Sequence, residues 1–319
     1  MMDYDAFNGD ADGICALQQL RLADPREANL ITGVKRDIGL LRRIHGGKED
    51  RVTALDISLD KNRADLLRLL DDGVHVRYFD HHYSGVIPAH ANLAATIDTT
   101  PDRGTCYLVD SALGGRYRGW AVVGTFGDNF DHTAEAIAAT LELHPGALGA
   151  LRELGILINY NAYGSQVEDL HLPPDELFRR ISPFQDPLEF IAADDTVRLL
   201  REGYQGDMSK ANDLVPDLET DTHAMYILPA EAWARRVSGV FANQLAQGAT
   251  GRAHAILTQL AGGAYLVSVR APLDRPDGAD ELCRGFATGG GRKAAAGINH
   301  LAMGDLDRFR REFAKSFAI

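Results

Sequence analysis

The chain has no long apolar run and few cysteines. None of its 319 residues lies in an apolar stretch of the about 18 residues that a membrane-spanning helix needs. Its start, Met-Met-Asp-Tyr-Asp, lacks the basic and apolar regions of a secretory signal peptide. The three cysteines, Cys15, Cys106 and Cys283, are too far apart for a disulfide framework or a cysteine-based zinc site. These absences predict a cytoplasmic protein with no membrane partner.

Positive charge is also scarce. The 33 Lys and Arg residues face 45 Asp and Glu residues, which gives a net charge of −12. A chain this acidic is poorly suited to follow long duplex DNA, because surfaces that do so are usually basic. The acidic excess lies in residues 1–220, whereas residues 221–319 carry 12 basic and 9 acidic residues. This asymmetry indicates one part that gathers cations and another that can meet anions.

The length and the apolar pattern predict two α/β domains, at roughly 150 residues per domain. Over the first 130 residues, strand-like runs alternate with segments of helical periodicity, which predicts a mostly parallel sheet covered by helices. Residues 131–200 have a mainly helical pattern, and residues 201–222 are polar and irregular. We therefore predict an N-terminal domain over 1–200 that includes a helical connector, a linker over 201–222, and a smaller α/β domain over 223–319.

Acidic and imidazole side chains follow several predicted strands. They are Asp10 and Asp12 after the first strand, Asp56 after the third, Asp80, His81 and His82 after the fourth, and Asp128 after the apolar run 120–126. Ligands of open α/β sheets bind beyond the carboxyl ends of the strands, so we expect these side chains to meet. Carboxylates and imidazoles without thiolates favour Mn²⁺ or Mg²⁺. Two such ions about 3.5–4 Å apart can activate a water and hold a phosphoryl group.

The spacing of Asp10 and Asp12 suits such a site. In extended backbone, residues i and i+2 point the same way, so each carboxylate could serve one of two neighbouring ions. The alternative is that these residues are ordinary caps: Asp12 could cap a helix that starts at Gly13. The gathering of four such segments at one predicted sheet edge favours the metal site.

The same segments resemble the motifs of the DHH phosphoesterases. Phe7–Gly13 (FNGDADG) resembles the first motif, Ala54–Ile57 the second, and Gly127–Asn129 the fourth, while Tyr78–His82 contains the Asp-His-His signature itself. The resemblance spans residues 3–130. It implies an enzyme in which two Mn²⁺ ions activate a bridging hydroxide that attacks phosphorus in line.

The resemblance also implies a role for each metal ligand. Asp10 and Asp56 would hold one Mn²⁺ ion, and Asp56 would bridge to a second ion. The second ion would be held by Asp12, Asp56, His81 and Asp128. Asn8 stands where many family members have His, and an amide oxygen binds Mn²⁺ more weakly than an imidazole does. The first ion would therefore be held less tightly than in those members.

Two further residues receive catalytic roles from the same resemblance, beside the bridging Asp56. Asp80 would orient an imidazole, and His82 would face the substrate phosphate.

A glycine-rich basic segment lies near the C-terminus. It runs Gly289-Gly290-Gly291-Arg292-Lys293. Backbone N–H groups of glycines can approach a phosphate closely, and the two basic side chains supply charge. We expect the following Ala294–Gly297 to start a helix. A flexible loop between two elements is the alternative.

This segment resembles the signature of the DHH-associated domain, which accompanies RecJ nucleases, nano-RNases and phosphatases of cyclic dinucleotides or phosphoadenosine. Arg270 in Ser-Val-Arg resembles a strand-borne substrate contact of that domain. Arg103 could also touch a phosphate, although a surface turn explains it as well.

Together these features predict a Mn²⁺-dependent phosphoesterase that acts on short oligonucleotides, dinucleotides or phosphorylated nucleotides. Short substrates are expected because the C-terminal charge is too small to follow a long backbone. One alternative is an exopolyphosphatase or pyrophosphatase with the same metal centre, and another is a non-catalytic nucleotide sensor of the same fold. The glycine-rich segment favours a nucleotide enzyme, and only Asn8 favours the sensor. The same residues are compatible with Mg²⁺ as the metal ion, and the sequence is compatible with a homodimer.

Overall fold

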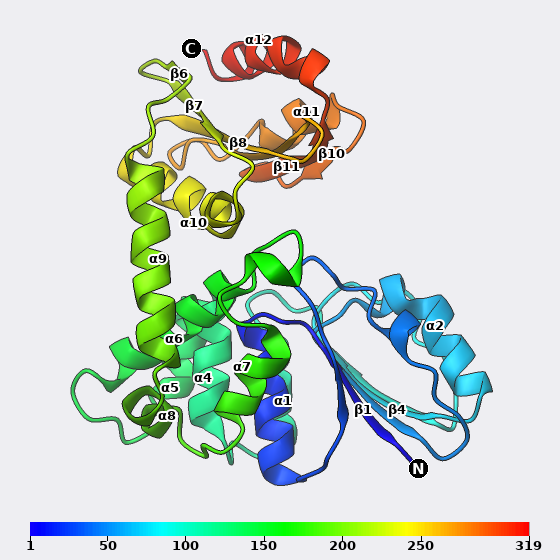
Figure 1. The fold of residues 1–319 in the computed structure, drawn as a ribbon. Helices are drawn as coiled ribbons and strands as arrows, with labels where there is room; N and C mark the ends of the chain where they lie inside the picture. The colour runs from blue at the N-terminus through cyan, green and yellow to red at the C-terminus, as the bar shows by residue number, and fades with distance from the viewer. Residues whose placement is uncertain (319) are drawn as a thin grey trace. The chain divides into compact units, whose positions relative to one another are not determined.

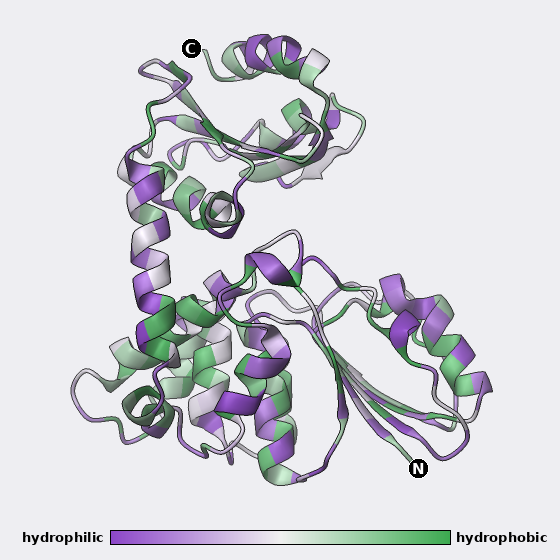
Figure 2. Ribbon diagram, in the orientation of Figure 1, coloured by the Kyte–Doolittle hydropathy of each residue, from purple (hydrophilic) through white to green (hydrophobic). Residues whose placement is uncertain are grey.

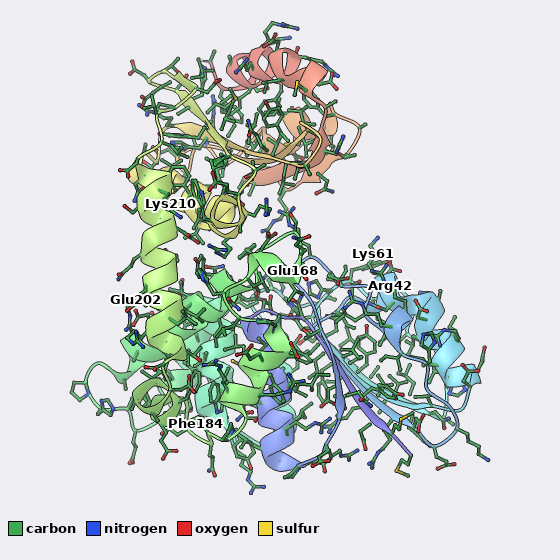
Figure 3. The ribbon with its side chains drawn as sticks, viewed as in Figure 1. Arg42, Lys61, Glu168, Phe184, Glu202 and Lys210 are labelled. Carbon is green, nitrogen blue, oxygen red and sulfur yellow. The ribbon has the colours of Figure 1, made fainter. Side chains whose placement is uncertain are left out.

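The computed structural model describes residues 1–318 in two compact units (Figure 1). The first unit is Met1–Glu202, and the second begins at Gly203. Glu202 and Lys210, both labelled in Figure 3, lie on one helix, α9 (Thr196–Asn212). The irregular linker that we predicted over 201–222 is therefore wrong for residues 201–212. The polar, irregular composition suggested a linker, but buried apolar residues recur at helical spacing, namely Val197, Leu200, Met208 and Ala211.

The first unit contains a five-stranded sheet in which every pair of neighbouring strands is parallel. Its strands are β1 (Asp3–Phe7), β2 (Asn29–Ile31), β3 (Arg51–Leu55), β4 (His75–Asp80) and β5 (Leu93–Ile97). This confirms the predicted parallel sheet. The strand order is β2-β1-β3-β4-β5, so the direction of winding reverses between β1 and β3. Ligands of such sheets bind at this reversal, beyond the carboxyl ends of the strands.

Helices α1 (Ala11–Ala23) and α2 (Leu59–Asp71) lie on opposite faces of this sheet (Figure 1). The arrangement follows from the strand order, because right-handed connections that wind in opposite directions place their helices on opposite faces. Helix α2 buries a leucine stripe that includes Leu66 and Leu69 in a core with Val52 and Tyr78 of the strands.

A group of helices covers the α1 side of the sheet. They are α3 (Thr105–Ala112), α4 (Arg118–Gly127), α5 (Asp131–Ala138), α6 (Ala147–Asn161), α7 (Pro174–Ile181) and α8 (Pro187–Ala193). Apolar residues dominate α4 and α6 (Figure 2), and the apolar run 120–126, which fitted a strand or a helix, is part of α4. The indole N–H of buried Trp120 donates to the carbonyls of Phe184 (3.2 Å; Figure 3) and Gln185 (3.1 Å), which ties α4 to the chain before α8.

Helix α4 ends against the start of α1. A Cβ at Gly127 would lie 2.3 Å from the Cβ of Ala11, so only glycine permits this approach. The contact matters for function because Asp128 follows Gly127 directly, and Asp10 and Asp12 flank Ala11. Close helix packing therefore brings carboxylates from distant segments together.

The second unit contains a six-stranded mixed sheet in the order β10-β11-β9-β8-β7-β6. Its strands are β6 (Leu218–Glu219), β7 (His223–Leu228), β8 (Ala253–Gln259), β9 (Tyr265–Arg270), β10 (Gly289–Gly291) and β11 (Ala295–Leu301). The helices are α10 (Ala232–Gly248), α11 (Ala279–Arg284) and α12 (Leu306–Phe317). Phe309, Phe313 and Phe317 of α12 are buried in its core. This confirms a second, smaller α/β unit.

The helix predicted to start within Ala294–Gly297 is wrong, because this segment belongs to strand β11. Ala296 and Ile298 are buried while Gly297 between them is less so, which is the alternation of a strand. The glycine run pairs with this strand, with Gly290 opposite Gly297. Within residues 1–318, no helix combines the length and apolar character needed to cross a bilayer.

A buried histidine in β8 makes stability depend on pH. His254 is 2% exposed, and its Nδ1 atom has no hydrogen-bond partner among the described residues. Burial lowers the pKa of His254 from 6.5 to about 4, with a further contribution from the charge of Arg252. The unfolded chain therefore takes up a proton first as the pH falls below about 6.5, and the stabilisation is lost progressively toward pH 4.

We expect His254→Leu to remove about 2 kcal/mol of the loss in unfolding free energy between pH 7 and pH 5. The measurement is chemical denaturation of both proteins at the two pH values. His300→Leu, at an exposed position of β11, is the control and should keep the wild-type pH dependence. An unchanged pH dependence in His254→Leu would contradict the assignment.

Candidate metal centre

Asp10 and Asp12 meet at the start of α1, but not through extended backbone. Asp10 is the N-cap of α1, and one of its carboxylate oxygens accepts the N–H of Gly13 (3.1 Å). Asp12 already lies in the first helical turn, so the i, i+2 argument from extended backbone is wrong. The helix begins earlier than that argument assumed, because Asp10 is itself a good cap.

The carboxylate of Asp12 caps helix α3 and not the helix that contains Gly13. Its two oxygens accept the N–H groups of Thr105 (2.6 Å) and Cys106 (2.7 Å), the first residues of α3. Gly104 makes this approach possible, since a Cβ there would lie 2.8 Å from Asp12 Oδ2. An ionised carboxylate keeps further lone pairs, so these bonds leave Asp12 able to bind a cation.

Asp56 follows β3 at the centre of the group. Its backbone has a φ of 57°, a left-handed conformation that costs a residue other than glycine on the order of 1 kcal/mol or more. Its N–H donates to the carbonyl of Phe79 (3.0 Å), and its Oδ1 accepts the hydroxyl of Thr105 (3.1 Å). The side chain is buried and faces the other carboxylates. The surrounding bonds thus hold Asp56 in a strained conformation, as is common at functional sites.

The two histidines after β4 have different surroundings. His81 Nε2 lies 3.4 Å from Asp56 Oδ1, 3.7 Å from Asp128 Oδ2 and 4.0 Å from Asp12 Oδ2. His82 instead places Nδ1 2.7 Å from Asp80 Oδ1 and keeps 42% of its side chain exposed. Asp80 is fully buried and also accepts the backbone N–H of His82. Asp80 therefore orients His82, while His81 faces the carboxylates.

The pKa values reflect negative charge gathered out of water. Burial and the charge of Asp128 raise the pKa of Asp12 to about 6. Burial, with the charges of Asp10 and Asp12, raises the pKa of Asp56 well above its usual range. Burial alone would lower the pKa of His82, but the hydrogen bond and charge of Asp80 hold it above its ordinary value. A bound cation would relieve this repulsion.

A lysine that we did not predict lies among these carboxylates. Lys35 Nζ lies 2.5 Å from Asp10 Oδ2, 3.0 Å from Asp128 Oδ1 and 3.0 Å from Asn159 Oδ1. Burial would raise the pKa of Asp10, but the charge and hydrogen bond of Lys35 outweigh it, so that pKa is lowered. The only signal in the sequence was a lysine soon after the second predicted strand, and most such lysines are solvated.

Asn8 contacts the lysine loop and the neighbouring carboxylate residue. Its amide nitrogen donates to the Lys35 carbonyl (3.3 Å), and its amide oxygen accepts the N–H of Asp10 (3.3 Å). The amide oxygen that could have bound a metal is therefore already a hydrogen-bond acceptor.

Two sets of side chains could each converge on one metal ion. They are Asp12, His81 and Asp128 in one set, and Asp56, His81 and His82 in the other. Within each set the ligand atoms lie within 4.8 Å of one another. The sets share His81, and Asp10 belongs to neither. Each set could hold a hard cation, and His81 Nε2 faces carboxylates of Asp12, Asp56 and Asp128.

Three basic residues of the second unit, Arg270, Arg292 and Lys293, lie at one end of its sheet. Arg292 and Lys293 are exposed at the tip of the β10–β11 hairpin, where the N–H of Arg292 donates to the carbonyl of Ala295 (2.9 Å). Arg270 ends β9 and pairs in register with Ala295, so it lies beside this tip. Its guanidinium donates to Asn243 Oδ1 (2.9 Å). Gly289-Gly290-Gly291 is strand β10 and not a free loop.

Arg103 belongs to the first unit. Its guanidinium pairs with Asp98 (3.0 Å) and stacks over the ring of Tyr107 at 5.4 Å. These contacts fit the second explanation given for Arg103, a residue of a surface turn.

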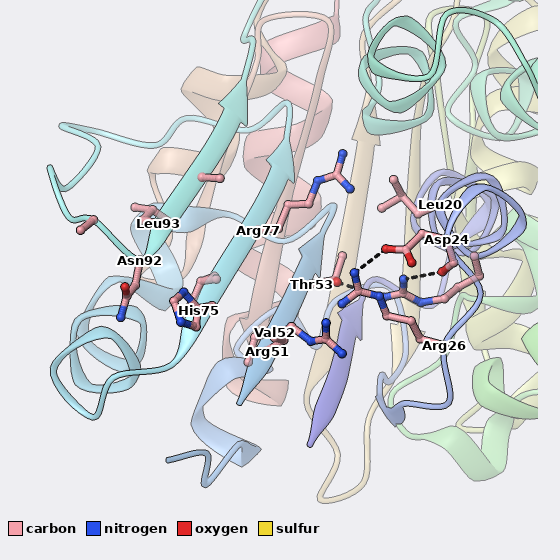
Figure 4. Close-up of a pocket in the computed structure, with 14 residues that line it drawn as sticks. Leu20, Asp24, Arg26, Arg51, Val52, Thr53, His75, Arg77, Asn92 and Leu93 are labelled. Atoms are coloured by element: carbon pink, nitrogen blue, oxygen red, sulfur yellow. Dashed lines mark hydrogen bonds and ion pairs between the residues drawn. The ribbon is translucent and has the colours of Figure 1, made fainter. Parts of the chain in front are cut away.

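A cavity of about 290 Å³ opens at the opposite end of the first sheet (Figure 4). Arg51 and His75 line it, and they are the first residues of β3 and β4. Two further lining arginines pair with aspartates, Arg21 with Asp5 and Arg26 with Asp24. Because it lies at the amino ends of the strands, we assign it no role.

No protein-family model matches this chain, and no curated protein matches it significantly. Solved structures do match. Exonuclease RecJ bound to manganese superimposes with a TM-score of 0.64 at 18% identity, over 99% of this chain and 90% of that one. RecJ in complex with Mn²⁺ from Thermus thermophilus gives a TM-score of 0.66 at 18% identity, over 99% of this chain but only 52% of that one.

Two further structures match with lower identity. The DHH domain of a protein from a ribosomal protein family gives a TM-score of 0.62 at 14% identity, over 98% of this chain and 86% of that one. A pGpG-specific phosphodiesterase from Vibrio cholerae gives 0.56 at 13% identity, over 99% and 98% of the two chains. The chain therefore has the fold of the DHH proteins, as its motifs predicted.

We expect Gly104→Ala to weaken Mn²⁺ binding at least about tenfold, as loss of a ligand's supporting contacts commonly does. The new methyl group would push the Asp12 carboxylate away from α3. Isothermal titration with Mn²⁺ measures the effect. Gly149→Ala, in α6 with open space around it, is the control and should bind as the wild type does. A folded Gly104→Ala protein with wild-type affinity would remove Asp12 from the metal site.

Proposed function

We propose that this chain is a Mn²⁺-dependent phosphoesterase that hydrolyses short oligonucleotides, dinucleotides or phosphorylated nucleotides. The observation that carries the proposal is the meeting of Asp12, Asp56, His81 and Asp128 at the winding reversal of the first sheet. The DHH fold supports it, since RecJ is an exonuclease and the Vibrio cholerae protein is a phosphodiesterase.

The donor set fits a hard divalent ion. Three carboxylates and one imidazole, without thiolate, suit Mn²⁺, and both RecJ structures contain manganese. The chemistry that such an ion supplies is Lewis-acid polarisation of a phosphoryl group and activation of water at neutral pH. The resemblance implied two ions, but Asp10 already pairs with Lys35. The pairing of Asp10 with Lys35 therefore favours a single ion at this site.

His82 would act on the substrate directly. Asp80 holds its Nδ1 atom, and the exposed part of the ring leaves Nε2 to face a phosphoryl oxygen. Despite burial, the hydrogen bond and charge of Asp80 raise the pKa of His82, which favours the protonated form more than in a free imidazole. A protonated imidazole can donate a hydrogen bond to the charge that develops on phosphorus-bound oxygens or on the leaving oxygen.

The second unit would bind the nucleotide part of the substrate. Arg270, Arg292 and Lys293 lie at one end of its sheet, beside the glycine strand β10. Guanidinium groups bind phosphates through paired hydrogen bonds. Three basic side chains suffice for one or two phosphates but not for a long backbone, which supports short substrates.

We expect Mn²⁺-dependent release of mononucleotides from oligonucleotides of two to five residues. Asp56→Ala and His81→Ala should abolish it, because each removes a ligand from the centre of the site. The assay is chromatography of products, with pyrophosphate tested alongside. Asp71→Ala, at an exposed residue of α2, is the control and should stay active. Hydrolysis of pyrophosphate alone would favour the pyrophosphatase alternative, and Mn²⁺ binding without turnover of any phosphoester would favour the sensor.

We expect Arg292→Ala to raise KM about tenfold or more, since a hydrogen bond to a charged group contributes about 1.5–3 kcal/mol. Its Mn²⁺ affinity should not change, because Arg292 lies outside the first unit. Steady-state kinetics and Mn²⁺ titration test both statements. Arg311→Ala, exposed on α12, is the matched control. A selective loss of metal binding in Arg292→Ala would refute this role.

A further inference from the structure

We propose that the ammonium group of Lys35 takes the place of one of the two divalent cations, so that the chain binds a single Mn²⁺ ion. This inference rests on the metal site of the proposed function and specifies its composition. It departs from the two-ion centre that the resemblance implied. Its basis is the set of contacts that Lys35 makes within the first unit.

The contacts of Lys35 are those of a bound cation. An ammonium group has three N–H donors. The three oxygens nearest to it are Asp10 Oδ2 at 2.5 Å, Asp128 Oδ1 at 3.0 Å and Asn159 Oδ1 at 3.0 Å. Two carboxylates and an amide oxygen are also ligands that a hard metal ion would take. Lys35 therefore pairs with Asp10, which the resemblance assigned to one ion, and with Asp128, which it assigned to the other.

The backbone of Lys35 is held in place as well. Its N–H donates to the carbonyl of Ala162 (2.9 Å), and its carbonyl accepts the amide nitrogen of Asn8 (3.3 Å). The ring of Tyr163 lies 5.7 Å from Nζ, within the range of a cation–π contact. The end of α6, the residue after β1 and the loop after β2 thus all fix this lysine. This support distinguishes it from a surface lysine that reaches a nearby acid.

The two carboxylates that Lys35 contacts differ in what they have left for a metal. Asp10 accepts the Gly13 N–H (3.1 Å) at one oxygen and pairs with Lys35 at the other, so the ammonium already balances its charge. Asp128 gives only Oδ1 to Lys35, while its Oδ2 faces His81 at 3.7 Å. Asp128 would therefore link the ammonium to the remaining metal ion. Asp10 would serve the ammonium alone.

Asn8 fits the same conclusion. An imidazole stands at this position in many proteins that the first motif resembles, and it would be a strong Mn²⁺ ligand. Here the amide oxygen accepts the Asp10 N–H (3.3 Å) and the amide nitrogen supports Lys35. Asn8, which replaces a strong metal ligand, therefore lies directly beside Lys35, which supplies a fixed positive charge.

The experiment measures how many Mn²⁺ ions the full chain binds. The wild-type protein is equilibrated with Mn²⁺ and desalted, and bound metal is counted by mass spectrometry. We expect one ion per chain and an electron paramagnetic resonance spectrum of isolated Mn²⁺. Two bound ions with a coupled-pair spectrum would overturn the proposal, and so would the absence of bound Mn²⁺.

The Lys35→Ala variant tests whether Lys35 is the reason that the chain binds a single ion. Removing the ammonium frees Asp10 and one oxygen of Asp128, so we expect the count to rise from one ion to two, most clearly together with Asn8→His. Lys61→Ala, exposed on α2 (Figure 3), is the matched control and should keep one ion. A folded Lys35→Ala protein that still binds one ion would contradict the role of Lys35.

The single-ion site and the proposed phosphoesterase activity can be refuted independently of each other. One bound ion without turnover of any phosphoester would support the single-ion site and refute the phosphoesterase. Two ions with Mn²⁺-dependent hydrolysis would refute the single-ion site and support the phosphoesterase.

Discussion

Mutual repulsion among buried carboxylates is the constraint on which the functional part of this molecule depends. Asp10, Asp12 and Asp56 are each at most 1% exposed and lie within one small space with Asp128. Such a group is unstable unless hydrogen-bond donors and cations compensate its charge. The fold supplies the N–H groups at the starts of α1 and α3, a lysine, and room for a hard metal ion. A bound metal ion would balance the remaining negative charge and would also supply the proposed hydrolytic chemistry.

The topology explains why distant segments can contribute to one site. Winding reverses between β1 and β3, which opens a space at their carboxyl ends where Asp10 and Asp56 lie. Helix packing adds the rest: Gly127 lets α4 contact Ala11, and this places Asp128 near the start of α1. Caps that would otherwise count as ordinary local structure here orient the ligands. Asp12 both satisfies the first N–H groups of α3 and faces His81. Capping and cation binding are therefore compatible roles of one carboxylate.

The arrangement of positive charge separates this site from a symmetrical two-metal centre. In the proposed site, one cation is covalently part of the chain and is present at every metal concentration, whereas the Mn²⁺ ion would be exchangeable. Lys35 and Asn8 belong to two segments that contact each other. The difference from a two-metal centre is therefore confined to one side of the site. The opposite side, with His81 and the Asp80–His82 pair, keeps the groups that would meet a phosphate.

Local patterns in the sequence determined the parallel sheet and the side chains that follow its strands. These features depend on periodicity within a few residues, so sequence reasoning could reach them. It could not reach Lys35, whose partner Asp128 is 93 residues away, or the capping of α3 by Asp12. It also misjudged Ala294–Gly297 as the start of a helix, although Ala295–Gly297 form part of a strand because β9 and β10 pair with them. Contacts between remote segments decide which oxygen meets which cation, and only the packed tertiary structure brings those segments together.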